Sequence, residues 1–359
     1  MQFLLLGVLF SPTVASKMQQ QQGRPQVGMM YEGWHAHAYF GKGESRLTLE
    51  DVVRSNGTLA LSDMAPDSTA DGFYWHVEPE DGFYCIYRKR SNESEGCLPD
   101  CPNITGTLTR HANMLTGAGV DFVVADSTNF FVTGDDADCF QLRPFEVLAE
   151  EWLNLRMAGV STPRIAIWQN IQDPSGDLWE AYLSTYENPE YEDLIFKDEA
   201  TGRKVFFATA NPDPTIVAKL EAMNYAVVSM WAEHMDAFEA GEWTFFSPCI
   251  DAVTGAFTTS VSSFATGARC AQKMTTNAPI GATGTSLTVS PSWQASYSSL
   301  PFQAAGKLGG LTMKRQFETA FDAIRSAANG SGPVLDYLFV VRAHGTWFFR
   351  HPALIFFPL

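Results

Sequence analysis

Short, nearly uniform hydrophobic runs recur along the chain and predict its strands. The runs are four to six residues long, and apolar residues follow one another in them without alternating with polar ones. Strands that are covered on both faces, as in parallel sheets, have this composition. The eight predicted strands are residues 27–31, 121–126, 164–168, 204–209, 225–230, 243–248, 286–291 and 337–342.

Segments with apolar residues at helical spacing separate several of these strands. They cover residues 105–119, 143–159, 213–224 and 312–330, and the first two close on glycine. Asp213 and Pro214 suit the beginning of a helix. Strands that alternate with helices form right-handed crossovers between parallel neighbours. Eight such strands predict an α/β fold, a (β/α)8 TIM barrel.

The predicted barrel is one domain over residues 27–359, with two long insertions. Residues of about 55–104 follow the first strand, and residues of about 249–285 are rich in Thr, Ser, Ala and Gly. Long βα loops of a barrel shape its active site. The last residues, "TWFFRHPALIFFPL", carry two prolines and no helical pattern. We therefore expect a barrel that is incomplete or altered at its C-terminal end.

The first residues predict export. The stretch "FLLLGVLF" is apolar but too short to span a bilayer, and "VAS" offers small residues for cleavage. We interpret residues 1–16 as a secretory signal peptide and residues 17–26 as a polar linker. No later segment has the roughly 18 unbroken apolar residues of a membrane helix, so we expect a secreted protein without a membrane span.

Cysteines and glycosylation sequons agree with that expectation. The even cysteine count and three sequons before residue 104 predict a glycosylated surface insertion tied by disulfides. Cys97 and Cys101 could also bind zinc, but no second close pair or nearby His accompanies them, so a disulfide is favoured. The cysteines are Cys85, Cys97, Cys101, Cys139, Cys249 and Cys270, and the sequon asparagines are Asn56, Asn92, Asn103 and Asn329.

Charge excludes two classes of partner. Acidic residues outnumber basic ones by 40 to 24, which gives a formal net charge of −16. Nucleic acids and anionic membranes are bound through clusters of Lys and Arg. The longest basic run is "RKR" at 88–90. We therefore expect neither partner.

Polar and aromatic residues follow most predicted strands, at the end where a barrel carries its active site. Indoles stack on the C–H faces of sugar rings, while carboxylates and amides bind hydroxyls, so the pattern indicates a saccharide site. Each residue alone has an ordinary alternative: Trp in the core, Asp126 as a helix cap, Glu233 in a solvated loop. The candidates are Glu32, Trp34, His35, Asp126, Asn129, Trp168, Gln169, Trp231, Glu233 and Trp293.

Two of these candidates, Asp126 and Glu233, indicate the type of reaction. Glycoside hydrolysis uses two carboxyl groups, one as acid and the other as nucleophile or base. Asp126 and Glu233 follow different strands and are the predicted catalytic pair; Asp213 stays a possible member, and Glu32 is less favoured. The other candidates are predicted to bind a polysaccharide or oligosaccharide. No cofactor or metal is expected.

Four motifs resemble a known group of proteins. They are "VGMMYEGWH", "FYWHVEPEDGFY" at 73–84, "TRHANMLTGAGVDFVVADSTN" at 109–129 and "VVSMWAEHM" at 228–235. Together they are similar to secreted glycoside hydrolase family 71/99-like proteins of bacteria and fungi. The resemblance implies a (β/α)8 barrel that hydrolyses glycosidic bonds in polysaccharides. Asp126 and Asn129 match the "D.TN" turn, Trp34 and His35 the first strand end, and Trp231 the fifth.

One departure from the family keeps an alternative function open. Members often carry a Trp-Asn-Glu-Trp-like motif after the last strand, where this chain has "FVVRAHGTW" without Glu. A non-catalytic carbohydrate-binding barrel would keep the indoles and amides and lose that acid.

A metal-dependent amidohydrolase is the third interpretation. His35 and His37 have the His-x-His spacing of such barrels, and His234 fits their fifth strand loosely. The fourth, sixth and eighth strand ends lack the expected Lys, His and Asp. A metal needs three or four converging ligands, so this class is the least favoured.

Overall fold

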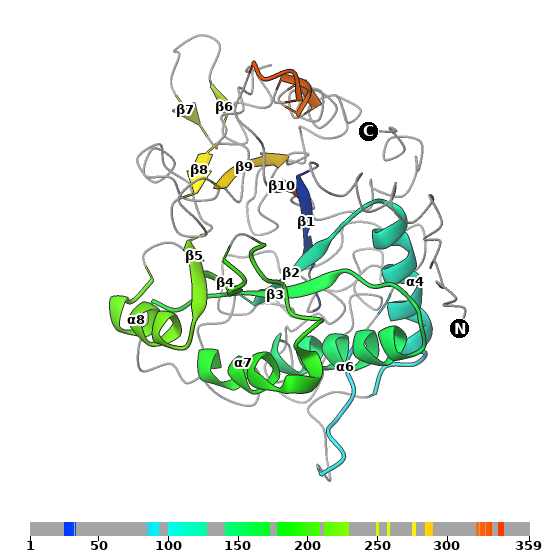
Figure 1. Ribbon diagram of the computed structural model, residues 1–359. Helices are drawn as coiled ribbons and strands as arrows, with labels where there is room; N and C mark the ends of the chain where they lie inside the picture. The colour runs from blue at the N-terminus through cyan, green and yellow to red at the C-terminus, as the bar shows by residue number, and fades with distance from the viewer. Residues whose placement is uncertain are drawn as a thin grey trace, which may run out of the picture.

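A mostly parallel β-sheet with helices packed against it forms the fold in the computed structural model (Figure 1). The structure describes residues 25–31, 33, 84, 86–92, 100–127, 141–172, 178–199, 201–208, 212–229, 249–250, 257–258, 275–277, 284–289, 321–322, 324–326, 328–331 and 337–340.

Eight strands make up the main sheet, in the order β5-β4-β3-β2-β1-β10-β9-β8. All neighbours are parallel except β8 and β9, which are antiparallel. The strands are β1 (Gln26–Tyr31), β2 (Phe122–Ser127), β3 (Arg164–Gln169), β4 (Lys204–Ala208), β5 (Tyr225–Ser229), β8 (Thr275–Asn277), β9 (Gly284–Val289) and β10 (Tyr337–Val340). A separate short pair joins β6 (Cys249–Ile250) to β7 (Phe257–Thr258).

The order of the parallel strands is consistent with an incomplete α/β barrel. In a barrel of consecutive strands, each strand pairs with its neighbours in sequence and the last strand pairs with the first. Here β10 pairs in parallel with β1, from Gln26 opposite Tyr337 to Met29 opposite Val340. The predicted strand 243–248, which falls between β5 and β9 in sequence, lies outside the described residues.

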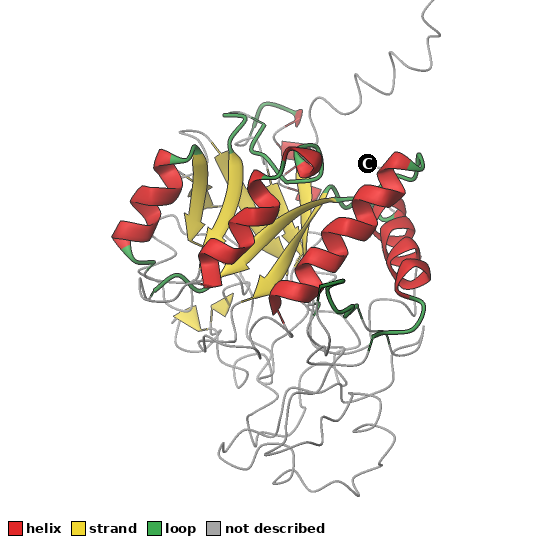
Figure 2. Cartoon of the chain, turned by 90° about the horizontal axis from the view of Figure 1, so that it is seen from below, coloured by secondary structure: helices red, strands yellow, loops and turns green. Residues whose placement is uncertain are grey.

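Helices cover one face of the sheet in chain order (Figures 1 and 2). Their bounds are α4 (Ile104–Gly117), α6 (Arg143–Met157), α7 (Leu178–Glu187) and α8 (Pro214–Ala222), and a 3-10 turn, η3 (Pro189–Tyr191), follows α7. Residues 321–322, 324–326 and 328 are also helical, inside the predicted helix 312–330. The sequence analysis missed α7, although Trp179, Tyr182 and Tyr186 have helical spacing and are buried.

Alternating strand residues build two buried clusters. On β2, Val123 and Ala125 belong to the cluster under the helices, whereas Phe122 and Val124 belong to the cluster on the other face. The second cluster draws Ala166 and Trp168 from β3, Val205 and Phe207 from β4, Ala226 and Val228 from β5 and Phe339 from β10. Side chains on one face of several parallel strands thus pack together, as in the interior of a barrel. We call this the inner face.

Packed side chains close the inner face at the N-terminal ends of the strands. The Phe122 ring stacks on Phe196 with centroids 3.8 Å apart, and Phe196 meets Tyr337 edge-on. The Tyr337 hydroxyl donates a hydrogen bond to the buried Asp198 carboxylate, which also accepts from the Thr201 amide. This end of the sheet is therefore occupied by structural contacts.

Ion pairs fix residues 86–90 onto α6. The Glu151 carboxylate is buried and accepts hydrogen bonds from Arg88 Nη2 at 2.6 Å and Thr105 Oγ1 at 2.7 Å. Arg90 Nη2 donates to Glu146 Oε2 at 2.9 Å. Buried charges need such partners, so these pairs define where the segment lies. It belongs to the predicted insertion of about 55–104.

Cys101 ties the same segment to the start of α4. Its amide donates to the Tyr87 carbonyl at 2.9 Å, and its sulfur accepts from the Tyr87 amide at 3.1 Å. Cys101 is disulfide-bonded. The disulfide framework as a whole stays a prediction, because the side chains of the other cysteines lie outside the described residues.

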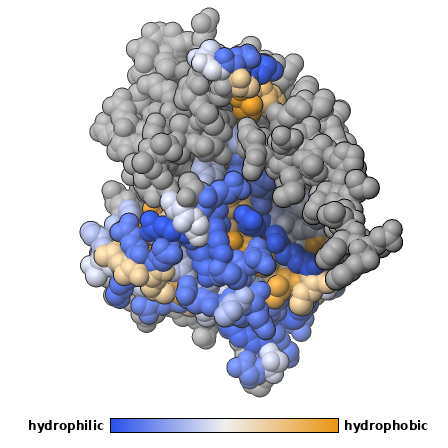
Figure 3. Space-filling view, in the orientation of Figure 1, coloured by the Kyte–Doolittle hydropathy of each residue, from blue (hydrophilic) through white to orange (hydrophobic). Residues whose placement is uncertain are grey.

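The surface over the described helices and strands is mainly hydrophilic, with small apolar areas (Figure 3). Among the described residues, Met157 and Met223 are the large hydrophobic side chains that are exposed. No helix in this part of the chain has the length and apolar character that a membrane crossing requires.

Candidate functional site

Asp126 lies on the inner face, at the C-terminal end of β2. Val124, two residues earlier, belongs to the inner cluster, and strand side chains on one face recur at every second position. Asp126 is 6% exposed and therefore buried at this strand end. The structure thus places this predicted catalytic residue at the strand end where barrel enzymes carry their sites.

Trp168 stands opposite Asp126 on the neighbouring strand. It is fully buried and packs in the inner cluster. The indole therefore packs in the inner cluster next to the position of Asp126, and it has no exposed face in this structure. Its role as a stacking platform stays a prediction.

The helix-side face at the same strand ends carries a second set of polar groups. Ser127 stands opposite Gln169, and both are buried. Ile165 and Ile167 belong to the helix-side cluster, so alternation puts Gln169 on that face and not beside Asp126. Its Oε1 atom is buried and accepts no hydrogen bond from the described residues.

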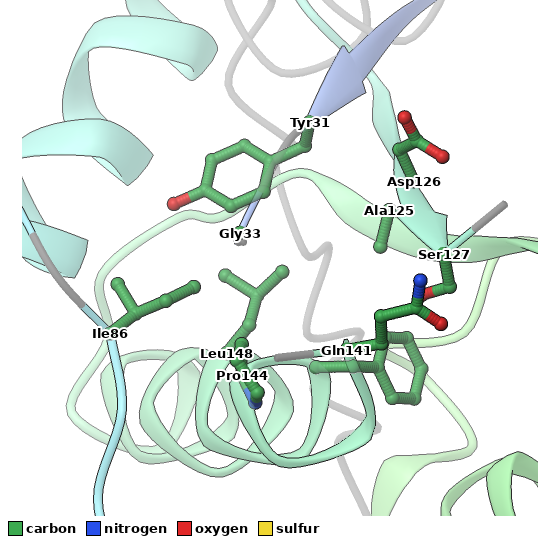
Figure 4. A pocket seen from close by; sticks show the side chains of 10 residues that line it. Tyr31, Gly33, Ile86, Ala125, Asp126, Ser127, Gln141, Pro144 and Leu148 are labelled. Atoms are coloured by element: carbon green, nitrogen blue, oxygen red, sulfur yellow. The ribbon is translucent and has the colours of Figure 1, made fainter. Parts of the chain in front are cut away.

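A small pocket opens between these strand ends and the start of α6. Figure 4 shows Gln141 beside Ser127, while the Asp126 carboxylate points away from the apolar side chains of Ile86 and Leu148. The pocket lies on the helix side of β2. It is lined by Tyr31, Gly33, Ile86, Ala125, Asp126, Ser127, Gln141, Pro144, Phe145 and Leu148.

Tyr31 anchors the end of β1 next to this pocket. Its hydroxyl lies 2.8 Å from His111 Nδ1 on α4, and its ring meets Trp152 of α6 edge-on, with centroids 6.0 Å apart. Tyr84 packs edge-on against His111 at 4.8 Å. Two helices and the insertion therefore hold the strand end that leads into the predicted residues Glu32 to His35.

Asp213, the possible third carboxylate, has a structural role. Its Oδ1 atom accepts hydrogen bonds from the amides of Thr215 at 2.8 Å and Ile216 at 3.2 Å, which caps α8. These bonds satisfy amides that a helix start would otherwise leave without partners. The cap accounts for Asp213 without catalysis.

Most of the predicted site falls outside the described residues. This applies to the second predicted catalytic residue, to most predicted binding residues and to the His-x-His pair: Glu32, Trp34, His35, His37, Asn129, Trp231, Glu233 and Trp293. Within the part of the chain that the structure describes, no three His, Cys, Asp or Glu side chains gather as a metal site would require.

The sequence analysis did not single out Tyr31, Ser127 or Gln141. Ser127 follows Asp126 directly, and its alternation with Ala125 could have placed it on the helix side. The contacts of Tyr31 depend on α4 and α6, which are distant in sequence. The sequence around Tyr31 therefore carries no signal for these contacts.

No protein-family model matches the chain, and no curated protein matches it. Two solved structures of the GH99 endo-alpha-mannosidase from Bacteroides thetaiotaomicron are similar to it, one of them in complex with BIS-TRIS-Propane. Both are 13% identical to this chain and cover 89% of it, with TM-scores of 0.43 and 0.44 over 83% and 84% of the matched chains. Likeness at this level does not identify a function.

Proposed function

We propose that the protein is a secreted glycoside hydrolase that acts on a polysaccharide or oligosaccharide through carboxylate chemistry. The observation that carries the proposal is the position of Asp126. Asp126 lies on the inner face at the C-terminal end of a central parallel strand, and the buried Trp168 stands opposite it on the neighbouring strand. The opposite strand ends are filled by Phe122, Phe196 and Tyr337, which leaves the Asp126 end for a ligand.

The proposal includes a closed (β/α)8 barrel. The pairing of β10 with β1 supports closure, because the first and last strands of a barrel are neighbours. Residues 243–248 would complete the ring between β5 and β9. Every strand end would then face the same rim, and the residues after strands 1, 5 and 7 would gather around Asp126.

In this arrangement Glu233 supplies the second carboxyl group. One of the two protonates the leaving oxygen, and the other acts as nucleophile or activates water, according to their separation. Sugar rings would stack on the indoles of Trp34, Trp231 and Trp293. Sugar hydroxyls would be bound, directly or through residues that they position, by Glu32, His35, Asn129 and Gln169. No step requires a metal or a cofactor.

A non-catalytic carbohydrate-binding barrel is the competing function. It is favoured by the residues after β10, which include Arg342 and His344 but no Glu before the end of "FVVRAHGTW". Such a protein would bind glycans at the same rim and release no products.

The proposal is tested by glycan turnover with variants of two aspartates, one at each end of β2. The purified protein is incubated with α-glucans, β-glucans and mannans, and new reducing ends and products are measured. Asp126→Asn is expected to lower kcat by about 10²-fold or more, since positioned acid–base groups contribute 10²–10⁴-fold. Asp121→Asn is the matched control, because Asp121 lies at the opposite end of the strand and bonds the Val27 amide at 2.7 Å.

The outcomes separate the candidates. Turnover that Asp126→Asn abolishes and Asp121→Asn retains supports the hydrolase. Glycan binding without turnover by the unmodified protein supports the carbohydrate-binding barrel. Equal turnover by Asp126→Asn and the unmodified protein, with both folded by circular dichroism, contradicts the assignment of Asp126.

A further inference from the structure

Three asparagines of Asn-x-Ser/Thr sequons lie among the described residues, and all three are exposed. Asn92 and Asn329 lie in turns, and Asn103 directly precedes α4. The first two flank ordered elements: Asn92 follows the segment that Arg88 and Arg90 fix onto α6, and the Asn329 amide bonds back to the Arg325 carbonyl. N-linked glycans need such exposed positions in the folded protein.

Asn103 has a conformation that leaves its amide group unused by the helix. It occupies the N-cap position of α4, where Asn ordinarily accepts a hydrogen bond from a first-turn amide. Instead its backbone is left-handed, with φ of 53°, and its side chain makes no cap bond. Asn188 and Asp213, at the same position of η3 and α8, both accept cap bonds through their side chains.

The Asn103 amide packs against Gly106, which has no side chain to displace it. The Asn103 side chain lies over Gly106, where an added Cβ would come within 2.4 Å of Oδ1 and 2.7 Å of Nδ2. Asn103, Thr105 and Gly106 are all exposed. The Asn103 amide therefore lies at the exposed start of α4, a helix on the side of the sheet opposite the inner face.

We propose that Asn103, Asn92 and Asn329 carry N-linked glycans. In the reaction, the side-chain amide nitrogen attacks the anomeric carbon of an oligosaccharide carried on a lipid diphosphate. The nitrogen–carbon bond forms as the bond from that carbon to the diphosphate oxygen breaks. The amide loses one proton, and the lipid diphosphate leaves. The donor and its transferase belong to the secretory pathway of the host cell.

The test is the mass of the full chain secreted from a eukaryotic host, before and after an amidase that cleaves N-glycans. Cleavage in ¹⁸O water converts each glycosylated Asn to labelled Asp, which peptide mass spectrometry locates. We expect label at residues 92, 103 and 329, and Asn103→Gln should lose one glycan. Thr105→Ser keeps the sequon and the hydroxyl that donates to Glu151, so it should keep the glycan.

Asn188→Gln is the matched control, since Asn188 lies outside any sequon and its loss should leave the mass of the glycans unchanged. An unmodified Asn103 peptide in the secreted, folded protein overturns the proposal. Recovery of the chain only in unmodified, unsecreted form overturns it as well. The mass measurement uses no substrate, so its failure is distinct from failure of the proposed hydrolase function.

Discussion

At the scale of single residues, two aspartates at opposite ends of β2 show how position decides the role of a carboxyl group. Asp121 precedes the strand and accepts a hydrogen bond from the Val27 amide, which fastens β1 to β2. Asp126 lies at the other end of β2, on the inner face and opposite Trp168. In the proposed function, only the second position can contact a ligand at the C-terminal strand ends.

Gly28 illustrates how closely the inner face is packed. A Cβ at this position would lie 2.3 Å from Cζ of Phe122. That ring is fully buried and stacked on Phe196, so it has no room to move aside. Gly28→Ala should therefore lower the free energy of unfolding by about 1–3 kcal/mol, the usual cost of overpacking, measured by urea denaturation.

Gly117→Ala is the matched control for that prediction. No atom lies within 4 Å of a Cβ built on Gly117, which ends α4. Alanine there should stabilise the protein by up to about 1 kcal/mol, because glycine weakens helices. A Gly28→Ala protein as stable as the unmodified one would contradict the packing described for Phe122.

Tyr186 gives a prediction about pH. Its buried hydroxyl accepts a hydrogen bond from the Ile167 amide at 2.5 Å, and burial raises its pKa above the ordinary value of about 10. Above pH 10 the unfolded chain loses this proton while the folded protein keeps it, so stability must fall as pH rises. The expected slope is about 1.4 kcal/mol per pH unit.

Urea unfolding between pH 9 and 11 measures this slope. Tyr186→Phe should reduce it, because the variant has no proton to lose at this position. The variant should also be about 1–3 kcal/mol less stable at neutral pH, since the Ile167 amide loses its acceptor. An unchanged slope in Tyr186→Phe would show that the hydroxyl ionises alike in both states.

At the scale of elements, the strands were the most predictable part of the chain. Seven of the eight predicted strands correspond to β1, β2, β3, β4, β5, β9 and β10, because burial on both faces leaves a continuous apolar run. The short strands β6, β7 and β8 were missed. They have two or three residues each, too few for any periodic signal.

The helices were predictable where stop and start signals frame them. Gly159 follows α6 with φ of 82°, and Asp213 caps α8, as the sequence indicated. The ion pairs that fix residues 86–90 onto α6 could not be predicted, because Arg88 and Glu151 are 63 positions apart. Such pairing depends on the fold already being formed.

Those ion pairs supply a prediction about the insertion. Glu151→Gln removes the charge that Arg88 and Thr105 contact, and it should destabilise the protein by about 1–3 kcal/mol. Residues 86–92 should also become more accessible to trypsin. The control is Glu180→Gln, whose exposed pair with Lys219 spans 3.7 Å and should contribute under about 1 kcal/mol. Equal effects from both variants would contradict the anchoring role of Glu151.

At the scale of the whole molecule, the parallel strands share one direction, and their N-terminal and C-terminal ends carry different residues. The N-terminal ends are filled by aromatic rings and by the Asp198–Tyr337 hydrogen bond. The C-terminal ends carry Asp126 and, on the helix side, Ser127 and Gln169. The sequence predicted a strand that ends at Asp126, and β2 ends one residue later, at Ser127. It did not predict that Trp168 would be fully buried, because exposure depends on segments that pack from elsewhere in the chain.

The central claim is that a saccharide binds at the C-terminal strand ends in contact with Asp126. The most direct measurement is a crystal structure of Asp126→Asn with an oligosaccharide that the unmodified protein cleaves. The account predicts a sugar ring within hydrogen-bonding distance of residue 126, and residues 243–248 paired between β5 and β9. A sugar bound at the end closed by Phe122, Phe196 and Tyr337, or on the outer helices alone, would contradict it.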